Sequence, residues 1–245
     1  MNASNKQALL GVGTNYKTIK SKKVGVLTGI LYMAPYTLSG KNVCPNASAG
    51  CAAACLNTAG RGAMKSVKRA RLKKTNRFWD DRGQFLQDLA EEVGKLQRRA
   101  EAIGMLAAVR LNGTSDLPYE RYKVPGTDKN IMELFPAVQF YDYTKLENRF
   151  INKKLPANYH LTFSRAEDND HKLAAVLEYT SASVVFSGKL PATWRGYPVI
   201  DGDEHDARFT DAGPGTIIGL TAKGKARHDG SGFVVPSCGT DSTWN

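Results

Sequence analysis

Three of the four cysteines lie close together, and their type and spacing suggest metal chemistry. Cys44, Cys51 and Cys55 fall within twelve residues, while Cys238 lies far along the chain. The gap of three residues between Cys51 and Cys55 would suit zinc, but the gap of six before Cys51 is not typical of structural zinc sites. Three close cysteines instead favour an iron–sulfur cluster. Buried thiols without a metal are the simplest alternative.

The residues between these cysteines also favour a cluster. They include the small-residue runs ASAG before Cys51 and AAA after it, which let a loop wrap closely around inorganic sulfide and iron. Cys238 is the remaining cysteine, and we expect it to be the fourth ligand of a [4Fe–4S] cluster. With four cysteines the cluster is closed, whereas with three one iron stays open to S-adenosylmethionine or substrate. The sequence permits both arrangements.

A run of positive charge follows the cysteines directly. The 245-residue chain has 34 Lys and Arg against 23 Asp and Glu, a net charge of +11. Residues 61–77 contain no acid and eight cations, namely Arg61, Lys65, Lys68, Arg69, Arg71, Lys73, Lys74 and Arg77. So many like charges repel one another unless an anion is present, and the phosphate backbone of nucleic acid is a common partner. A solvated helix face is the alternative.

The residues after this run indicate which nucleic acid would bind. Phe78 and Trp79 follow at once, and aromatic side chains can stack on unpaired bases. The chain contains no zinc-finger, RNA-recognition or helix-turn-helix signature. We therefore expect single-stranded nucleic acid, bound without sequence specificity.

Short apolar runs predict the elements that must position these residues. They occupy residues 24–33, 106–111, 138–141, 159–163, 183–186, 198–200 and 217–220. Their spacing leaves room for helices between strands, which favours a mainly parallel sheet. Apolar residues three and four apart from Phe85 to Ile103 predict an amphipathic helix, and shorter helices are expected at 145–153 and 173–177. We predict an α/β fold, a partial (β/α) barrel of mostly parallel strands with an iron–sulfur loop after the first strand.

The domain organisation is expected to be simple. Residues 1–23 suggest a loose, basic lead-in, and residues 24–245 a single α/β iron–sulfur domain. The lead-in lacks the apolar segment of a signal peptide, and no apolar run approaches the roughly 20 residues that cross a bilayer. We therefore expect a cytoplasmic protein with no membrane partner. The sequence leaves its oligomeric state open.

Polar residues follow the predicted strands. Because parallel strands share one carboxyl edge, these residues are expected to meet in one catalytic site, made of Asp116, Asp142, Lys145, Asp201 and Asp203. Carboxylates of this kind hold Mg²⁺ or Mn²⁺, and nucleases use such ions. Lys145 and Arg165 could bind phosphate at the same edge. The alternatives are ordinary turns and, for residues 201–206, an acidic surface loop.

Several of these segments together resemble a known phage-encoded family, called gene product 88-like. The similar motifs are CPNASAGCAAACLNTAGRG at 44–62, RLNGTSD at 110–116, QFYDYTK at 139–145, YHLTFS at 159–164 and DGDEHDARF at 201–209. The resemblance spans about residues 40–235 and implies a phage protein located in the host cytoplasm. More distantly, the cysteine loop is similar to that of radical S-adenosylmethionine enzymes, although its spacing departs from their C-x3-C-x2-C.

These observations lead to one principal functional expectation and two alternatives. We expect a phage-encoded [4Fe–4S] protein that acts on nucleic acid, as a single-strand DNA or RNA nuclease or as a binding protein. The first alternative is an enzyme similar to the radical S-adenosylmethionine class, acting on a nucleotide or another small molecule. The second is a non-catalytic protein in which the cluster is structural.

Overall fold

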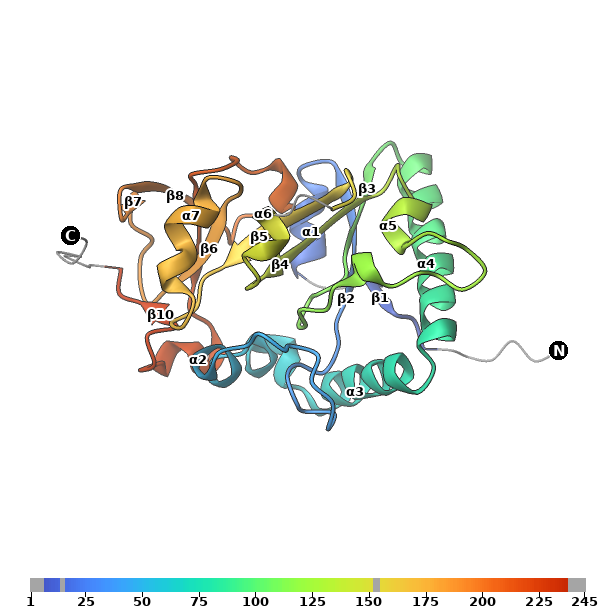
Figure 1. Ribbon diagram of the computed structural model, residues 1–245, viewed down its shortest axis with the longest axis horizontal. Helices are drawn as coiled ribbons and strands as arrows, with labels where there is room; N and C mark the ends of the chain where they lie inside the picture. The colour runs from blue at the N-terminus through green and yellow to red at the C-terminus, as the bar shows by residue number, and fades with distance from the viewer. Residues whose placement is uncertain (1–6, 14–15, 152–154, 238–245) are drawn as a thin grey trace.

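A mostly parallel sheet forms the centre of the computed structural model, which describes residues 7–13, 16–151 and 155–237 (Figure 1). Its strands are β1 (Leu10–Val12), β2 (Val26–Leu31), β3 (Leu106–Arg110), β4 (Gln139–Thr144), β5 (Tyr159–Ser164), β6 (Ala182–Phe186), β7 (Thr193–Trp194), β8 (Tyr197–Asp201), β9 (Ile217–Thr221) and β10 (Val234–Val235). They lie in the order β1-β2-β3-β4-β5-β6-β9-β8-β7, and β10 also pairs with β6. Only β1 with β2 and β7 with β8 pair antiparallel among the described strands.

The described sheet is open, with β1 and β7 at its two ends. The prediction of an α/β fold with mostly parallel strands is therefore confirmed, whereas no barrel closure is seen between these strands. β5 and β10 share one side of β6, since β5 pairs with Ala182 and Ser183, and β10 pairs with Val185 and Phe186. Segments distant in sequence therefore meet beside the end of β5.

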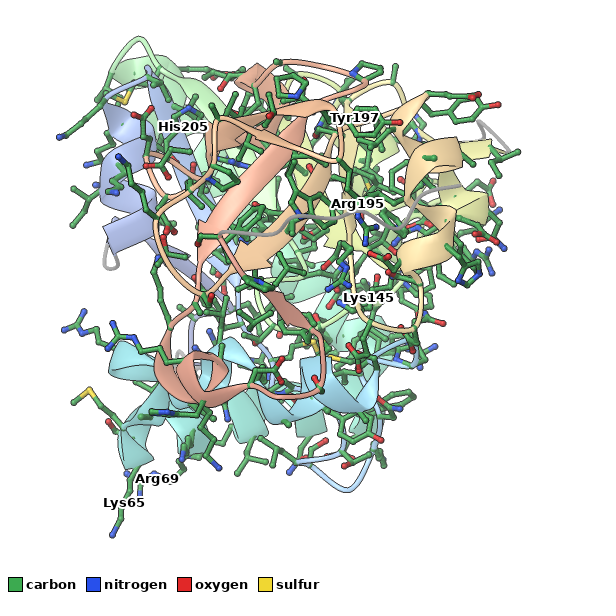
Figure 2. The ribbon with its side chains drawn as sticks, turned by 90° about the vertical axis from the view of Figure 1, so that its left-hand side faces the viewer. Lys65, Arg69, Lys145, Arg195, Tyr197 and His205 are labelled. Carbon is green, nitrogen blue, oxygen red and sulfur yellow. The ribbon has the colours of Figure 1, made fainter. Side chains whose placement is uncertain are left out.

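The helices differ in length and position. They are α1 (Tyr16–Lys22), α2 (Ala49–Ala53), α3 (Lys65–Asp80), α4 (Arg82–Ala102), α5 (Ile131–Leu134), α6 (Asn148–Ile151) and α7 (Leu173–Leu177), with 3-10 turns η1 (Leu56–Thr58), η2 (Gly60–Ala63), η3 (Tyr119–Arg121), η4 (Asp170–Lys172), η5 (Arg208–Thr210) and η6 (Gly224–His228). Figures 1 and 2 place α1 and α7 on opposite faces of the sheet. In the described part of the chain, no helix is long and apolar enough to cross a membrane.

The long helix α4 confirms the predicted amphipathic helix. Its start is capped by Asp81, whose Oδ1 accepts a hydrogen bond from Gln84 N at 2.9 Å. Its apolar stripe is buried and packs with residues of β2 and β3 in the main core. On β3, the alternation of side chains puts Ala107 and Val109 into this core, whereas Ala108 packs on the other face. Arg110 lies two residues after Ala108, so its side chain is on the same face of the sheet as that of Ala108.

The first described residues are packed, where a loose lead-in was expected. β1 pairs antiparallel with β2, and Leu9 and Leu10 are buried. Their backbone N–H groups donate to the Glu92 carboxylate of α4, at 2.7 and 2.8 Å. This segment is ordered because burying the side chains of Leu9 and Leu10 against the core stabilises β1 as an added edge strand.

Candidate functional site

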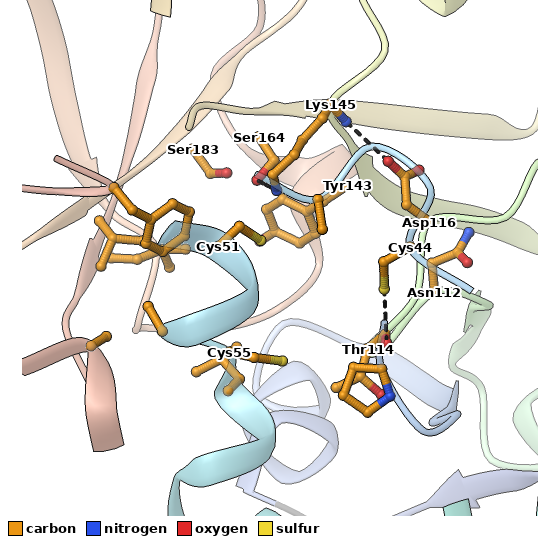
Figure 3. A pocket seen from close by; sticks show the side chains of 18 of the residues that line it. Cys44, Cys51, Cys55, Asn112, Thr114, Asp116, Tyr143, Lys145, Ser164 and Ser183 are labelled. Atoms are coloured by element: carbon orange, nitrogen blue, oxygen red, sulfur yellow. Dashed lines mark hydrogen bonds between the residues drawn. The ribbon is translucent and has the colours of Figure 1, made fainter. Parts of the chain in front are cut away.

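A cavity of about 230 Å³ lies at the carboxyl ends of the parallel strands (Figure 3). Cys44, Cys51 and Cys55 all line it, and all three are free thiols. Cys44 comes from the loop after β2, Cys51 from α2, and Cys55 from the start of η1. The prediction that these cysteines lie together at this edge agrees with the structure. The proposed fourth ligand, Cys238, lies outside the described residues.

One glutamate fixes the short helix that carries Cys51. Ser48 caps α2, and its Oγ accepts a hydrogen bond from Cys51 N at 3.0 Å and donates one to Glu167 Oε2 at 2.9 Å. Gly50 N donates to Glu167 Oε1 at 2.7 Å. A Cβ atom at position 50 would lie only 2.7 Å from Oε1, so glycine permits this approach. Glu167, just after β5, thereby ties the cysteine segment to the sheet.

Burial disfavours the thiolate form of two of these cysteines, Cys44 and Cys55. Burial raises the pKa of Cys44 to about 12, and burial also raises the pKa of Cys55. Cys44 Sγ accepts a hydrogen bond from Tyr36 N at 3.3 Å and lies 3.6 Å from Thr114 O. Because thiolates are the metal-binding form, any metal bound here would have to supply the stabilisation that burial removes.

Asp116 and Lys145 both line the cavity. Asp116 Oδ2 accepts hydrogen bonds from Lys145 N at 3.2 Å and from Thr144 Oγ1 at 3.3 Å, while Oδ1 lies 3.4 Å from Arg149 Nη1. The Lys145 ammonium donates to Ser164 Oγ at 3.2 Å. Burial would lower the pKa of Lys145, but its neighbours Cys51 and Asp116 raise it overall.

The other predicted carboxylates are arranged differently. Asp203 lines the cavity and forms an ion pair with Lys223. Burial opposes its ionisation, but the bond from Lys223 leaves the pKa of Asp203 below its usual value. Asp201 is exposed at the end of β8, does not line the cavity, and accepts from Asp203 N at 2.7 Å.

Asp142 is fully buried and does not line the cavity. Its Oδ1 accepts from Asn112 N at 2.6 Å, and its Oδ2 accepts from Tyr159 OH at 2.9 Å. Asp142 therefore positions Asn112, which does line the cavity. Among the described residues, no three or more His, Cys, Asp or Glu side chains form a group that could hold a metal ion. Of the five predicted catalytic residues, Asp116, Lys145 and Asp203 are brought together.

Four residues of the cavity wall were not among the predicted site residues. Arg110, Tyr143, Ser164 and Ser183 line it from β3, β4, β5 and β6. Arg110 donates to both carboxylate oxygens of Asp206, at 3.0 and 3.1 Å. The available signal was the alternation of side chains along each strand, which puts these residues on the face opposite the main core.

The basic segment divides into two sets. Arg61, Lys65, Lys68, Arg69 and Lys73 are exposed, and Figure 2 shows Lys65 and Arg69 pointing away from the body of the protein. The other three support the fold. Arg71 is buried and donates to Asn57 Oδ1 at 2.8 Å, Lys74 donates to Leu9 O at 2.6 Å, and Arg77 pairs with Asp88 at 2.6 Å.

The expectation that Phe78 stacks on bases is wrong, because this side chain is fully buried in the main core. Its ring packs edge-on against Phe85, at 5.4 Å between centroids. Trp79 is half-buried, and the guanidinium of Arg82 lies over its ring at 5.3 Å. The pair of aromatics therefore joins α3 to α4 and the core.

The fold and the site define a mixed α/β protein with a cysteine-lined cavity at the carboxyl edge of its parallel strands. The chain belongs to the Gene product 88 family, whose model matches residues 6–237. This match confirms the family resemblance predicted from the motifs, but it does not extend to radical S-adenosylmethionine enzymes. No curated protein and no solved structure matches the chain.

Proposed function

We propose that this protein binds a [4Fe–4S] cluster in the cavity and acts on single-stranded nucleic acid. The observation that supports this proposal is the meeting of three cysteines around one cavity, directly before a helix that presents exposed cations. Cys44, Cys51 and Cys55 would hold the cluster. Cys238 is proposed as the fourth ligand.

The chemistry of the donors supports such a cluster, although the described side chains do not converge closely enough to hold a single metal ion. A cluster spreads its ligands around an inorganic core, so it needs free cysteines distributed around a cavity, as here. Small side chains, Ala47 and Ala54, line the space between them, and the Lys145 cation offsets thiolate charge. When bound, the cluster supplies structural support or electron transfer with four thiolates, or an open iron for a small molecule with three.

The cluster is tested by purifying the protein without oxygen and measuring iron, sulfide and the visible spectrum. We expect a brown protein that contains iron, and we expect Cys51→Ser to lose the iron. Cys238→Ala should also lose it if the site is closed by four cysteines. A colourless protein that contains zinc would contradict the cluster assignment.

Nucleic-acid binding is proposed for the five exposed cations of η2 and α3. Replacing Lys65, Lys68 and Arg69 together by Ala should reduce the slope of log affinity against log salt by about 2, since each contact with a single strand contributes about 0.7. The matched control removes three exposed cations from α4, namely Lys95, Arg98 and Arg99. Equal effects of both triple variants, or no salt-dependent binding at all, would contradict the proposal.

Binding is better supported than cleavage. A nuclease that uses Mg²⁺ or Mn²⁺ would need Asp116 or Asp203 to bind the ion, and these carboxylates already pair with Arg149 and Lys223. Incubation of labelled single and double strands with each ion tests cleavage. Product formation that Asp116→Asn abolishes would establish a nuclease.

The cavity also favours a second candidate function, similar to that of radical S-adenosylmethionine enzymes. Its volume of about 230 Å³ exceeds that of a single water, so a small molecule could lie beside the cysteines. Cleavage of S-adenosylmethionine to 5′-deoxyadenosine by the reduced protein tests this alternative. A structural cluster would instead show intact nucleic-acid binding without turnover, and unfolding when the iron is removed.

A further inference from the structure

Lys145 differs from every other charged residue of the cavity wall. Arg110 pairs with Asp206, Arg165 with Asp170, Asp116 with Arg149, and Asp203 with Lys223. Within the residues that the structure describes, Lys145 Nζ has no carboxylate oxygen within 4.0 Å and donates to the Ser164 hydroxyl. Arg165, expected from the sequence to bind phosphate, is occupied by Asp170 and by the carbonyl of Phe233. The described wall therefore has one cation without a carboxylate partner, and the neighbours of its ammonium include the Ser164 hydroxyl and the Cys51 thiol.

The sheet register surrounds this cation with further hydrogen-bonding groups. Lys145 follows β4 directly, and Ser164 ends β5, where Thr144 is the partner of Phe163. Ser183 of β6 is the register partner of Ser164 and also lines the cavity. An ammonium and two hydroxyls are therefore presented from three adjacent strands. Figure 3 shows Lys145, Ser164 and Ser183 beside Cys51.

The wall beyond the ammonium is apolar. Phe233 lies with its ring centroid 5.9 Å from Lys145 Nζ, and Val185 and Leu220 line the same cavity. A half-buried cation that forms no ion pair with a carboxylate favours an anion, while an aromatic ring favours a flat organic group. A nucleotide combines these two features in one ligand.

We propose that the part of the cavity between Lys145 and Phe233, beside the cysteines, is a subsite for one nucleotide, with its phosphate held by Lys145 and Ser164 and its base against Phe233. This inference rests on the proposed nucleic-acid function, because a strand would place one nucleotide here while the exposed cations of α3 bind neighbouring phosphates. A free nucleotide has the same chemistry, and the experiment separates these two sources.

The test is titration calorimetry with deoxyadenosine 5′-monophosphate, deoxyadenosine, inorganic phosphate and a single-stranded oligonucleotide. The wild type should bind the monophosphate more tightly than the nucleoside. Lys145→Met should weaken monophosphate binding roughly tenfold to a hundredfold, the value of a charge-assisted hydrogen bond, and leave nucleoside binding unchanged. The triple variant of Lys65, Lys68 and Arg69 should bind the monophosphate normally and the oligonucleotide weakly.

Equal affinity for monophosphate and nucleoside would overturn the subsite, as would unchanged monophosphate affinity in Lys145→Met. If Lys145→Met lowers the iron content and leaves the monophosphate affinity unchanged, Lys145 serves to stabilise the thiolates, and this result would also overturn the nucleotide subsite. If Lys145→Met does not fold, Ser164→Ala decides, since it should weaken monophosphate binding severalfold. Monophosphate binding without oligonucleotide binding would support the subsite for free nucleotides and refute the strand as ligand.

Discussion

Asp142 is a carboxyl group whose surroundings determine its role. It follows an apolar run in the sequence, as a catalytic aspartate of an α/β protein would, but it lies on the core side of β4. Burial raises the pKa of Asp142 to about 7, although hydrogen bonds from Asn112 and Tyr159 act in the opposite direction. The side chain therefore titrates near neutral pH while positioning a cavity residue.

This shift has a consequence for the stability of the protein. The carboxyl ionises near 3.8 in the unfolded chain and near 7 in the folded one, so unfolding releases a proton between these pH values and Asp142 destabilises the fold as pH rises through them. Asp142→Asn should remove up to about 4 kcal/mol of this pH dependence. Urea unfolding of both proteins from pH 4 to pH 8 measures it, and a constant difference between them would contradict the assignment.

At the level of single residues, the sequence predicted best where the residue type is rare. Cys44, Cys51 and Cys55 line one cavity, and their clustering in the sequence was enough to single them out. Arg110 was missed because it ends an apolar run, and only its partner Asp206, 96 positions later, reveals that its charge is compensated. Spacing along the chain contains no information about such a partner.

The helix α2 is too short to be stable by itself, so its position depends on Glu167. Glu167→Gln should weaken the bonds to Gly50 N and Ser48 Oγ, and the loss of charge-assisted bonds of this kind costs about 1–3 kcal/mol. We expect amide hydrogen exchange at Gly50 and Cys51 to accelerate roughly tenfold to a hundredfold. Glu178→Gln, at an exposed position, is the control. Equal exchange in both variants would show that Glu167 does not hold this helix.

The helix α3 has one face in solvent and one against the protein. Arg71 lies on the inner face, bonded to Asn57 and with its guanidinium 4.9 Å from the Tyr32 ring centroid. Arg71→Met should lower the free energy of unfolding by about 1–3 kcal/mol, whereas Lys68→Met should change it by less than about 0.5 kcal/mol. Thermal and urea unfolding check this difference, and a Lys68 effect as large as that of Arg71 would refute it.

At the level of elements, amphipathic spacing predicted α4 well, because its apolar stripe packs in the main core. The uniform charge of residues 61–77 concealed the two faces of α3. Its inner cations donate to the Asn57 side chain and to the backbone carbonyls of Leu9 and Gln7, a hydrogen-bonding role that no hydrophobic pattern reveals. β1 was missed because three residues are too few to show an alternation.

The ion pair of Arg110 and Asp206 connects the two halves of the molecule, since Arg110 ends β3 and Asp206 follows β8. Both side chains are buried. Removing one partner of a buried pair leaves an uncompensated charge and costs about 3–5 kcal/mol. Arg110→Met and Asp206→Asn should each destabilise the protein by this amount.

The double variant provides the decisive comparison. The double variant should lose clearly less free energy of unfolding than the two single variants lose together, because no charge then remains unpaired. Urea unfolding of the wild type, the two single variants and the double variant gives this double-mutant cycle. Strict additivity would show that the two groups do not stabilise each other.

For the whole molecule, the sequence predicted the class of sheet but not its full order. The apolar runs imply parallel strands separated by connections, and seven of the observed strands (β2, β3, β4, β5, β6, β8 and β9) follow from them directly. The placement of β9 between β6 and β8 depends on pairings between distant segments. Two-residue strands such as β7 and β10 have no pattern of their own, and form where neighbouring strands offer free hydrogen-bonding groups.

The pairing of β10 with β6 has a consequence for how the protein is made. During synthesis the cysteine segment appears early, whereas Phe233 and β10 appear after every other strand. Arg165 can bind the carbonyls of Gly232 and Phe233 only at that stage. The wall that carries Phe233 is therefore assembled last, and until then the cysteines face a cavity that lacks this wall, which is the stage at which the proposed cluster would be inserted.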